Sequence, residues 1–556
     1  MPTTCRLTRA PSPSPFPRPP RPPPSHSFAA ALNGFRAASR GIDKYVFLRT
    51  LQREDASSFY RLLMANAMEI MPYVYTPTVG EACQTYHRLP IETHGVYITA
   101  EDAGRVGEAL RERSPARLRD SRDLEVAVVT DGERVLGLGD LGAGGMGIAE
   151  GKILLYTTCA GVDPARCLPV CLDVGTNNEA LLADPGYKGL RARRVRGAAY
   201  DALVDEFMRE MRRWQPRALV QFEDFGNQNA FRVLDAYRDA QPCFNDDIQG
   251  TACVALAAIE SGLRVTGSAL EEQTILFYGA GEAGVGIGEL VAEAMAKSSG
   301  GKLSVRDAMR RCVFMDSKGT VCAERLSVPE DSPLRLQRHK LAFAHEGVPM
   351  LAGLLDAVKA LRPTALVGVS TIGGAFDEAV VREMARLNER PIIMPLSNPT
   401  HLSECTFEDA VRWTEGRVVF ASGSPFPPAT NDSDSARDGK TRTLYPAQAN
   451  NAYVFPAVGR AAVLAGAGSV TDDDFLVAAE ALSRMTSEEE LASGRLFPNF
   501  DHIQAVSAAL TARVCEGMER GGRATRRPAG TWAELVEREF FRPPEEEGGR
   551  GGRSKL

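Results

Sequence analysis

The stretch TILFYGAGEAGVGIGEL, residues 274–290, constrains the fold more than any other part of the sequence. Its apolar start predicts a strand over residues 274–279, and we expect the following helix to begin near Val285. The strand ends in Gly279, and four further small residues precede the helix: Ala280, Gly281, Ala283 and Gly284. Small residues at this point let the backbone turn tightly and approach a pyrophosphate at the helix N-terminus. A Gly-rich turn can be purely structural, but the order strand, glycines, helix favours a dinucleotide-binding, Rossmann-like domain.

Short apolar runs of the same kind recur along the chain, each followed by helix-forming sequence. They occupy residues 126–130, 168–174, 218–222, 312–315, 365–370 and 391–397. Strands that are apolar throughout are typical of parallel sheets, which are buried on both faces. The sequence therefore predicts an α/β fold, and its 556 residues suffice for two or more domains.

Two acidic doublets follow apolar runs: Glu223-Asp224 comes after ALVQF, and Asp246-Asp247 comes shortly after PCF. Ligands of parallel sheets gather beyond the carboxyl ends of the strands, so both doublets are expected on one rim. Carboxylates brought together repel each other, and a cation with oxygen ligands, Mg²⁺ or Mn²⁺, would remove that cost. The alternative is solvated loop charges, with Asp246 or Asp247 capping a helix that opens at Ile248.

The strand predicted over residues 312–315 ends in Asp316-Ser317-Lys318. An acid at this point could bond a ribose hydroxyl and favour NAD. Ser317 and Lys318 could instead hold the extra phosphate of NADP. The signal is mixed and leans to NADP.

Two further motifs stay ambiguous when taken alone. Residues 137–152 also satisfy GxGxxG, at Gly137, Gly139 and Gly142, but the pattern equally fits a close helix–strand contact that ends in a surface lysine. Asn398 follows a predicted strand and could donate to a ligand carboxylate, although an Asn-Pro turn needs no ligand.

Composition excludes several classes of protein. The net charge of −6 and the pI near 5.8 give no electrostatic reason to bind nucleic acid or an anionic membrane. No apolar run reaches the length of a transmembrane helix. The eleven cysteines form no CxxC pair and the seven histidines are scattered, so we expect reduced thiols and no zinc site. A small-molecule partner fits better.

The two ends of the chain point to different compartments. Residues 1–42 are rich in proline and arginine and hold no acidic residue, which predicts a disordered arm, a plastid or mitochondrial transit peptide, or a wrongly assigned start. Residues 521–556 form a charged, Gly-rich tail with one helical stretch at 531–541. The tail ends in Ser554-Lys555-Leu556, which matches the peroxisomal address.

Eight motifs in order along the chain resemble those of malic enzyme, and the likeness is collinear from about Asp43 to Glu516. They are VYTPTVGEAC (74–83), VTDGERVLGLGDLGAGGMGIAEGK (129–152), CLDVGTNNEALL (171–182), QFEDFGNQNAF (221–231), FNDDIQGTA (244–252), GAGEAGVGI (279–287), PLSNPT (395–400) and FASGSPF (420–426). The resemblance implies oxidative decarboxylation of (S)-malate to pyruvate and CO₂ with NADP or NAD and a divalent metal. It also implies a homo-oligomer, dimer or tetramer.

The resemblance further implies a division of the chain. An N-terminal malate- and metal-binding α/β domain would span residues 43–246, and a Rossmann-like NAD(P)-binding domain residues 247–450. C-terminal helices over residues 451–520 would pack back on the first domain and complete it.

Roles for single residues also come from the resemblance. It assigns the metal to three carboxylates: Glu223, Asp224 and Asp247. Lys152 would be the general base for the C2 hydroxyl, held by Asp246, and burial beside the metal cation would lower its pKa. Tyr75 would be the general acid that protonates enolpyruvate at C3. Malate would be bound by three further residues: Arg134, Asn398 and Asn450.

Some features depart from the family. The helical segment that normally precedes Asp43 is replaced by the proline arm, which puts the subunit contact in doubt. Ala447 and Ala449 stand where the family has glycine, so the loop around Asn450 is expected to sit differently, because alanine resists positive φ. The polar loop over residues 427–443 is longer than usual, and residues 98–125 carry a short insertion. A non-catalytic binding or assembly subunit and a nonoxidative malate decarboxylase remain alternatives.

Overall fold

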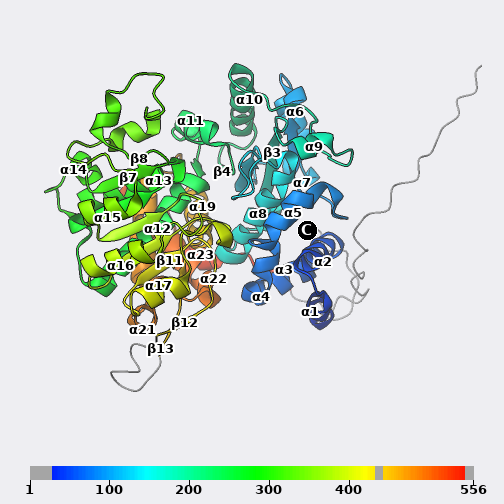
Figure 1. Ribbon diagram of the computed structural model, residues 1–556. Coiled ribbons are helices and arrows are strands. Elements are labelled where there is room, and N and C mark those ends of the chain that lie inside the picture. Colours follow the sequence, from blue (N-terminus) through cyan, green and yellow to red (C-terminus); the bar gives the residue numbers. More distant parts are fainter. Residues whose placement is uncertain (1–27, 432–441, 545–556) are drawn as a thin grey trace, which may run out of the picture.

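The computed structural model describes residues 28–431 and 442–544, and in it two parallel sheets carry helices on both faces (Figure 1). The five-stranded sheet has the order β1-β3-β2-β4-β5 and is parallel throughout. Its strands are β1 (Val96–Thr99), β2 (Val126–Thr130), β3 (Cys167–Asp173), β4 (Leu219–Glu223) and β5 (Cys243–Asn245).

The seven-stranded sheet has the order β14-β11-β10-β9-β6-β7-β8, and within it only β8 runs antiparallel to its neighbour. Its strands are β6 (Ile275–Tyr278), β7 (Cys312–Asp316), β8 (Gly319–Thr320), β9 (Ala365–Gly368), β10 (Ile392–Pro395), β11 (Val419–Ser422) and β14 (Ala447–Gln448). Every apolar run predicted as a strand forms one, and the α/β fold class is confirmed.

Alternate residues of the first sheet face two different cores, as the pleat requires. Val129 and Phe222 pack with α6 (Val106–Arg113) and α10 (Ala198–Trp214). Val128 and Leu219 pack on the other face with α8 (Met146–Ala160).

The second sheet is arranged in the same way. Leu276 and Ile393 face α16 (Glu378–Leu387), whereas Phe277 and Met394 face α12 (Thr251–Thr266) and α13 (Glu282–Ser298). The face that packs on α12 and α13 belongs to the same continuous core as the α8 face of the first sheet. One hydrophobic core therefore joins the two sheets.

Helix α8 lies inside this core, and all of its fifteen residues are buried. A helix without a solvated polar face is typical of such a position. From the C-terminal part of the chain, α19 (Phe455–Ala465) and α22 (Ile503–Arg520) contact α8, and α20 (Asp472–Met485) contacts α12. Segments distant in sequence thus enclose the helix that carries Lys152.

The remaining helices cover the outer faces and the loops. They are α3 (Ala56–Ala65), α4 (Ala67–Val74), α5 (Thr78–Thr85), α7 (Ala116–Arg119), α9 (Glu179–Ala183), α11 (Asn227–Tyr237), α14 (Val305–Met309), α15 (Leu354–Leu361), α17 (Phe407–Trp413), α21 (Glu488–Ala492) and α23 (Trp532–Arg538). The helix predicted within residues 531–541 is confirmed as α23.

Three local predictions need correction. Residues 28–42 are not part of a disordered arm: α1 (Phe28–Ala37) and α2 (Gly41–Glu54) form there, and Phe35 is fully buried. The reason is that the prolines end before this stretch, whose alanines and spaced apolar residues favour a helix with one buried face. Residues 1–27 and the terminal Ser-Lys-Leu lie outside the described residues.

The other two corrections are smaller. Helix α13 begins at Glu282, three residues before the predicted start at Val285. The predicted polar loop over residues 427–443 is not all loop: it contains β12 (Ala429–Asn431), which pairs antiparallel with β13 (Arg442–Leu444). Residues 432–441 lie outside the described part of the chain.

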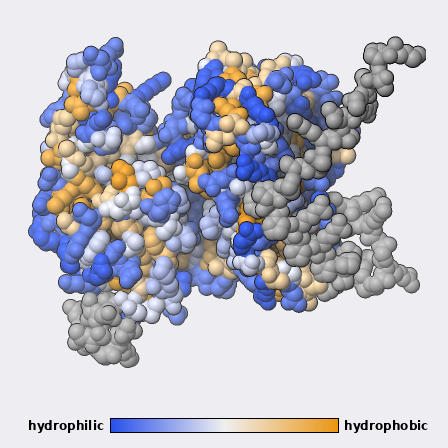
Figure 2. All heavy atoms as spheres, turned by 45° about the vertical axis from the view of Figure 1, so that its right-hand side comes forward, coloured by the Kyte–Doolittle hydropathy of each residue, from blue (hydrophilic) through white to orange (hydrophobic). Residues whose placement is uncertain are grey.

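Hydrophilic residues cover most of the face drawn in Figure 2, with smaller apolar patches between them. None of the helices in the described ranges combines the length and the apolar character that a membrane span requires.

Candidate active site

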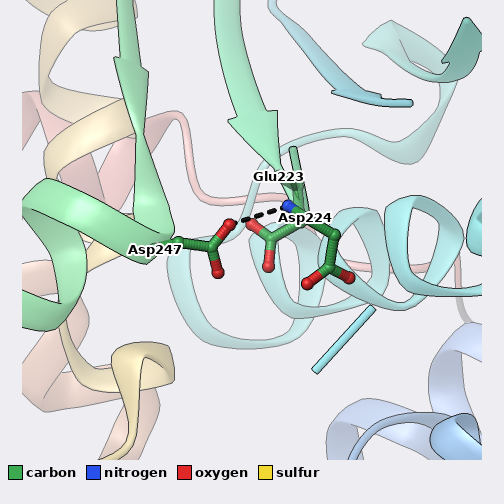
Figure 3. A group of neighbouring side chains, drawn as sticks. All are labelled: Glu223, Asp224 and Asp247. Carbon is green, nitrogen blue, oxygen red and sulfur yellow. Dashed lines mark hydrogen bonds between the residues drawn. The ribbon is translucent and has the colours of Figure 1, made fainter. Parts of the chain in front are cut away.

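Three carboxylates converge at the carboxyl edge of the first sheet (Figure 3). Glu223 is the last residue of β4, Asp224 follows it, and Asp247 lies at the start of the helical segment after β5. One oxygen of each carboxylate lies within 4.8 Å of the others. The two acidic doublets therefore lie on one rim of the sheet, as predicted.

The backbone around this cluster fixes the directions of the carboxylates. Asp224 adopts a positive φ of 56°, which is uncommon for a residue other than glycine. Its N–H donates to Asp247 Oδ2 at 2.7 Å, and its own Oδ1 accepts from Leu136 N–H at 3.0 Å. Its Oδ2 is buried and has no hydrogen-bond partner among the described residues. This oxygen is therefore able to accept a bond from a ligand.

The electrostatics of the cluster favour a cation. Burial raises the pKa of Glu223 and of Asp224 well above the ordinary range, and the charge of Asp247 raises both further. A hard divalent ion such as Mg²⁺ or Mn²⁺ takes carboxylate oxygens as ligands and would relieve this repulsion. The orphaned oxygen, the spacing and the donor type therefore all fit the predicted metal site.

Lys152 lies beside the cluster and is buried, which excludes the surface lysine that the sequence left open. Its Nζ lies 2.9 Å from Glu223 Oε1 and donates to Asp246 Oδ2. The rings of Tyr75 and Phe455 enclose it, with centroids 5.5 and 4.5 Å from Nζ. The amine is thus confined between two carboxylates and two aromatic rings.

The predicted lowering of the Lys152 pKa relies on a bound cation, and the protein groups alone have the opposite effect on it. Burial lowers it, but the charges of Asp246 and Glu223 outweigh burial and raise the pKa well above its usual value. A cation on Glu223 would have to offset that carboxylate before the amine could act as a base near neutral pH.

Tyr75 follows the last residue of α4 and is buried. Burial raises the pKa of its hydroxyl above the usual value, and the nearby carboxylates Glu223 and Asp246 add to the shift. The hydroxyl therefore stays protonated at neutral pH, as a proton donor must.

Asp246 does not cap the helix, contrary to one of the alternatives. Asn245 is the capping residue, and its Oδ1 accepts from the N–H groups of Asp247 and Ile248. Asp246 Oδ2 instead accepts from Lys152 and, at 3.1 Å, from Asn451 Nδ2. Asn451 was missed in the sequence because nothing local links it to a residue some two hundred positions away.

Arg134 lies on the loop after β2, and this loop approaches the Asn398 loop after β10. Arg134 is exposed, its backbone N–H donates to Asp224 O at 3.1 Å, and its guanidinium donates to Asn227 Oδ1 at 2.5 Å. A Cβ on Gly137 would lie 2.4 Å from the carbonyl oxygen of Asn398, so the two loops touch. Gly137 thus serves close backbone packing, which is the structural alternative for this motif.

Asn450 caps a short 3₁₀ turn, with its Oδ1 accepting from Ala452 N–H at 2.9 Å. Ala447 belongs to strand β14, paired with β11, and neither Ala447 nor Ala449 has a positive φ. The two alanines are therefore accommodated without backbone strain.

The glycine turn after β6 has the features that a dinucleotide needs. Gly279 has a φ of 118°, and a Cβ there would lie 2.6 Å from Val369 O. A Cβ on Gly284 would lie 2.7 Å from Gly279 O, whereas one on Gly281 would meet nothing within 4 Å. The outer glycines are required by the protein itself, and Gly281, before the first turn of α13, leaves open space for a ligand phosphate.

At the end of β7, Asp316 is already paired. Arg325 bonds both of its oxygens at 2.9 Å, and Lys340 Nζ lies 2.9 Å from Oδ2. Ser317 and Lys318 are exposed beside it. Because its charge is compensated, Asp316 is less available to a ribose hydroxyl, and the surplus of cations favours a phosphate. Arg325 and Lys340 were missed because loops bring them to the site.

Gln221 was not predicted as a residue of the site, although its spacing from Glu223 indicates such a position. It lies two residues before Glu223 in β4, so the pleat places both side chains on one face. Gln221 Nε2 donates to Glu223 Oε2 at 2.9 Å, and Tyr156 OH donates to Gln221 Oε1 at 2.6 Å. This chain of bonds orients the carboxylate.

Comparison with known proteins identifies the family to which the chain is similar. The sequence model "Malic enzyme, N-terminal domain" matches residues 52–238, and "Malic enzyme, NAD binding domain" matches residues 248–518. The chain is 46% identical to an NADP-dependent malic enzyme of Anas platyrhynchos, over 89% of this chain and 85% of the relative. It is 45% identical to one of Vitis vinifera, over 89% and 80%. The crystal structure of Entamoeba histolytica malic enzyme has a similar fold, with a TM-score of 0.58 and 22% identity over 91% of this chain and 89% of that one.

Proposed function

The chain belongs to the malic enzyme family, and we propose that it oxidatively decarboxylates (S)-malate to pyruvate and CO₂ while reducing NADP⁺. The single observation that carries the mechanism is Lys152, buried between Asp246 and Glu223 at the edge of the three-carboxylate cluster. Burial of a lysine between carboxylates costs desolvation free energy, and such perturbed groups cluster at catalytic sites, whereas binding alone does not require one.

The substrate would lie between the first sheet and the loops that end the strands of the second. Arg134 pairs with none of the described acidic side chains, so its guanidinium is available to a malate carboxylate. Asn398 and Asn450 would add amide donors. These contacts would place the C2 hydroxyl of malate near Lys152.

In the oxidation step Lys152 would remove the proton of the C2 hydroxyl while the C2 hydride leaves for the nicotinamide. Asp246 would orient the amine, and Asn451 would hold Asp246. A divalent cation held by Glu223, Asp224 and Asp247 would supply Lewis-acid stabilisation of negative charge on the substrate oxygens in both steps.

After CO₂ is lost, the resulting enol must gain a proton at C3. Tyr75 is buried, and its ring centroid lies 5.5 Å from Lys152 Nζ. The raised pKa of its hydroxyl keeps this group protonated. Tyr75 would donate that proton, and Lys152 could return one to the tyrosine.

The choice of NADP is supported by the end of β7. Lys340 and Arg325 pair with Asp316 there and Lys318 is exposed beside it, which leaves an excess of positive charge for the 2′-phosphate. The relatives described above carry NADP dependence in their names.

Two further proposals concern organisation. We place the substrate and metal domain at residues 43–246, the coenzyme domain at residues 247–450 and the completing helices at residues 451–520. We also propose a homo-oligomer, dimer or tetramer, on family membership alone, and sedimentation velocity at several concentrations tests it.

Steady-state kinetics test the function. The purified full chain should reduce NADP⁺ with malate and Mn²⁺ and produce pyruvate. Lactate as the product would instead reveal a nonoxidative decarboxylase. A folded chain that binds NADPH but turns over malate with neither NADP⁺ nor NAD⁺ would be a non-catalytic subunit.

A further inference from the structure

Glu404 is a fully buried carboxylate between the short 3₁₀ turn Thr400–Leu402 and α17. It forms no ion pair with any lysine, arginine or histidine of the described residues. Its Oε1 accepts three hydrogen bonds: from Ser370 N–H at 2.9 Å, from Ser370 Oγ at 2.9 Å and from Ser397 Oγ at 2.6 Å. Buried charges are rarely left with neutral partners alone, so this one requires an explanation.

The two serines lie on different loops of the coenzyme-binding sheet. Ser370 follows β9 and Ser397 follows β10, so Glu404 ties the carboxyl ends of two neighbouring strands. Backbone bonds strengthen the tie, since Gly374 N–H donates to Ser403 O at 3.1 Å and Phe376 N–H to Glu404 O at 2.9 Å.

The loop after β9 is strained at the point where Glu404 holds it. Thr371 has a φ of 56°, in the left-handed region that a β-branched residue avoids. Its N–H donates to Ser397 Oγ at 2.8 Å, and Ser397 in turn donates to Glu404. The hydrogen bonds to Glu404 therefore stabilise a conformation that threonine would not adopt alone.

Both loops border the candidate active site. A Cβ on Gly279 would lie 2.9 Å from Ser370 N, and Ser397 directly precedes Asn398. β9 and β6 are adjacent although three strands apart in sequence, which marks the switch point of the sheet, where dinucleotides bind. The adenosine side lies toward β7 and Asp316, so the loops after β9 and β10 are on the nicotinamide side.

We propose that Glu404 is a positioning residue that holds the Ser370–Thr371 turn and the Asn398 loop in the geometry that receives the nicotinamide and malate. The inference rests on the proposed function and extends it to a residue that touches neither ligand. A misplacement of about 1 Å in such a site can cost about a hundredfold in rate.

The test compares Glu404→Ala with Glu404→Gln in the full chain. Glutamine has an oxygen at the Oε1 position, which can accept the same three hydrogen bonds. Only Oε2, which Ser397 N–H approaches at 3.4 Å, is replaced by an amide nitrogen. We expect Glu404→Ala to lower kcat/KM for NADP⁺ by about ten- to a hundredfold and to weaken NADPH binding, measured by fluorescence. Glu404→Gln should retain most of both, within about threefold.

Glu490→Ala is the matched control, because Glu490 also accepts from neutral groups, Ser487 N–H and Oγ and Asn499 N–H, and among the described residues it forms no hydrogen bond with the loops after β9 and β10. It should lower thermal stability without changing NADPH affinity. If Glu404→Ala binds NADPH and turns over malate as Glu490→Ala does, while both are folded, the positioning role is refuted.

A rescue experiment separates positioning from general stability. Glycine adopts a φ of 56° without strain, so adding Thr371→Gly to Glu404→Ala should recover at least about threefold of the lost kcat/KM. No recovery would count against the proposal. Because NADPH binding needs no turnover, these affinities test Glu404 even if the unaltered chain proves inactive with malate, an outcome that would refute the proposed function instead.

Discussion

Lys152 Nζ lies 2.9 Å from Glu223 Oε1, so the candidate base and a candidate metal ligand share one ion pair. The charge of each group therefore shifts the pKa of the other. A cation bound to Glu223 would offset its negative charge and so lower the pKa of Lys152. Loss of the cation would raise that pKa again. Metal binding and base strength are coupled in this arrangement.

Replacement of Lys152 by alanine should abolish most of the turnover. Loss of a general acid–base group typically costs about 10²- to 10⁴-fold in kcat. NADPH binding should persist, because Lys152 lies on α8 and not on the glycine turn. Lys297→Ala, which removes an exposed lysine of α13, is the control for kinetics and fluorescence titration. Unchanged kcat in Lys152→Ala would contradict the assignment.

Asp247→Asn should weaken metal binding and relieve repulsion. Asparagine can still accept from Asp224 N–H through its oxygen, but the charge that raises the pKa of Glu223 and Asp224 is gone. Without metal the variant should melt at the same temperature as the unaltered chain or higher. With Mn²⁺ a tenfold weaker site loses about 1.4 kcal/mol of stabilisation.

Differential scanning calorimetry with EDTA and with rising Mn²⁺ measures both effects of Asp247→Asn. Asp205→Asn, at an exposed position of α10, should behave like the unaltered chain. Equal Mn²⁺-induced rises in Tm for all three proteins would rule out Asp247 as a ligand.

Lys340→Ala should change coenzyme preference. Lys340 lies on the cation-rich rim at Asp316, and its loss removes a charge available to the 2′-phosphate. We expect kcat/KM for NADP⁺ to fall by about ten- to a hundredfold, the equivalent of roughly 1.4 to 2.7 kcal/mol, with little change for NAD⁺. An equal loss with both coenzymes would show that the lysine does not discriminate between them.

Glu260→Gln should make the protein more stable at alkaline pH. Burial raises the pKa of Glu260 to about 8, and the charge of Glu480 adds to the shift while Arg484 opposes it. The unfolded chain releases this proton near pH 4.5 but the folded chain keeps it until about pH 8, so stability falls as pH rises through that window.

Above pH 8 the glutamine variant should therefore exceed the unaltered chain by on the order of 2–4 kcal/mol, and the advantage should vanish near pH 4. Tm measured at pH 5 and pH 9 gives the comparison. Glu537→Gln, an exposed site on α23, provides the control. A pH-independent difference for Glu260→Gln would mean that the buried carboxyl does not titrate in this window.

Phe35→Ala should destabilise the N-terminal helices. The ring is fully buried, meets Tyr73 edge to face at 5.3 Å, and lies 4.8 Å from Lys44 Nζ. Removal of a buried phenylalanine costs about 3–5 kcal/mol. Asn33→Ala, on the exposed face of the same helix, should have little effect on Tm. Equal Tm values for both variants would mean that α1 does not pack on the domain.

The strands and the metal-ligand cluster could be predicted from sequence because their signals are local or periodic. An apolar run between turn signals defines a buried strand, and parallel strands end on one rim, so the acids that follow β4 and β5 had to approach each other. Family resemblance then supplied Lys152 and Tyr75, whose own surroundings carry no readable pattern.

The remaining contacts depend on the path of the chain between elements. Asn451 reaches Asp246, and Arg325 and Lys340 reach Asp316, only through loops whose geometry no spacing rule gives. The pKa of Lys152 in the protein alone reflects two carboxylates at once, and this balance of charges depends on distances that no sequence pattern gives.

The bond between Asn451 and Asp246 has a consequence for biosynthesis. A ribosome that has released residues 1–247 has already delivered all three candidate metal ligands and Lys152, but Asn451 and Phe455 are still unmade. Until they emerge, Lys152 lacks the enclosing ring of Phe455, and Asp246 lacks the hydrogen bond from the Asn451 amide. Assembly of the catalytic centre therefore requires a late part of the sequence, and a chain truncated before Asn451 should carry no activity.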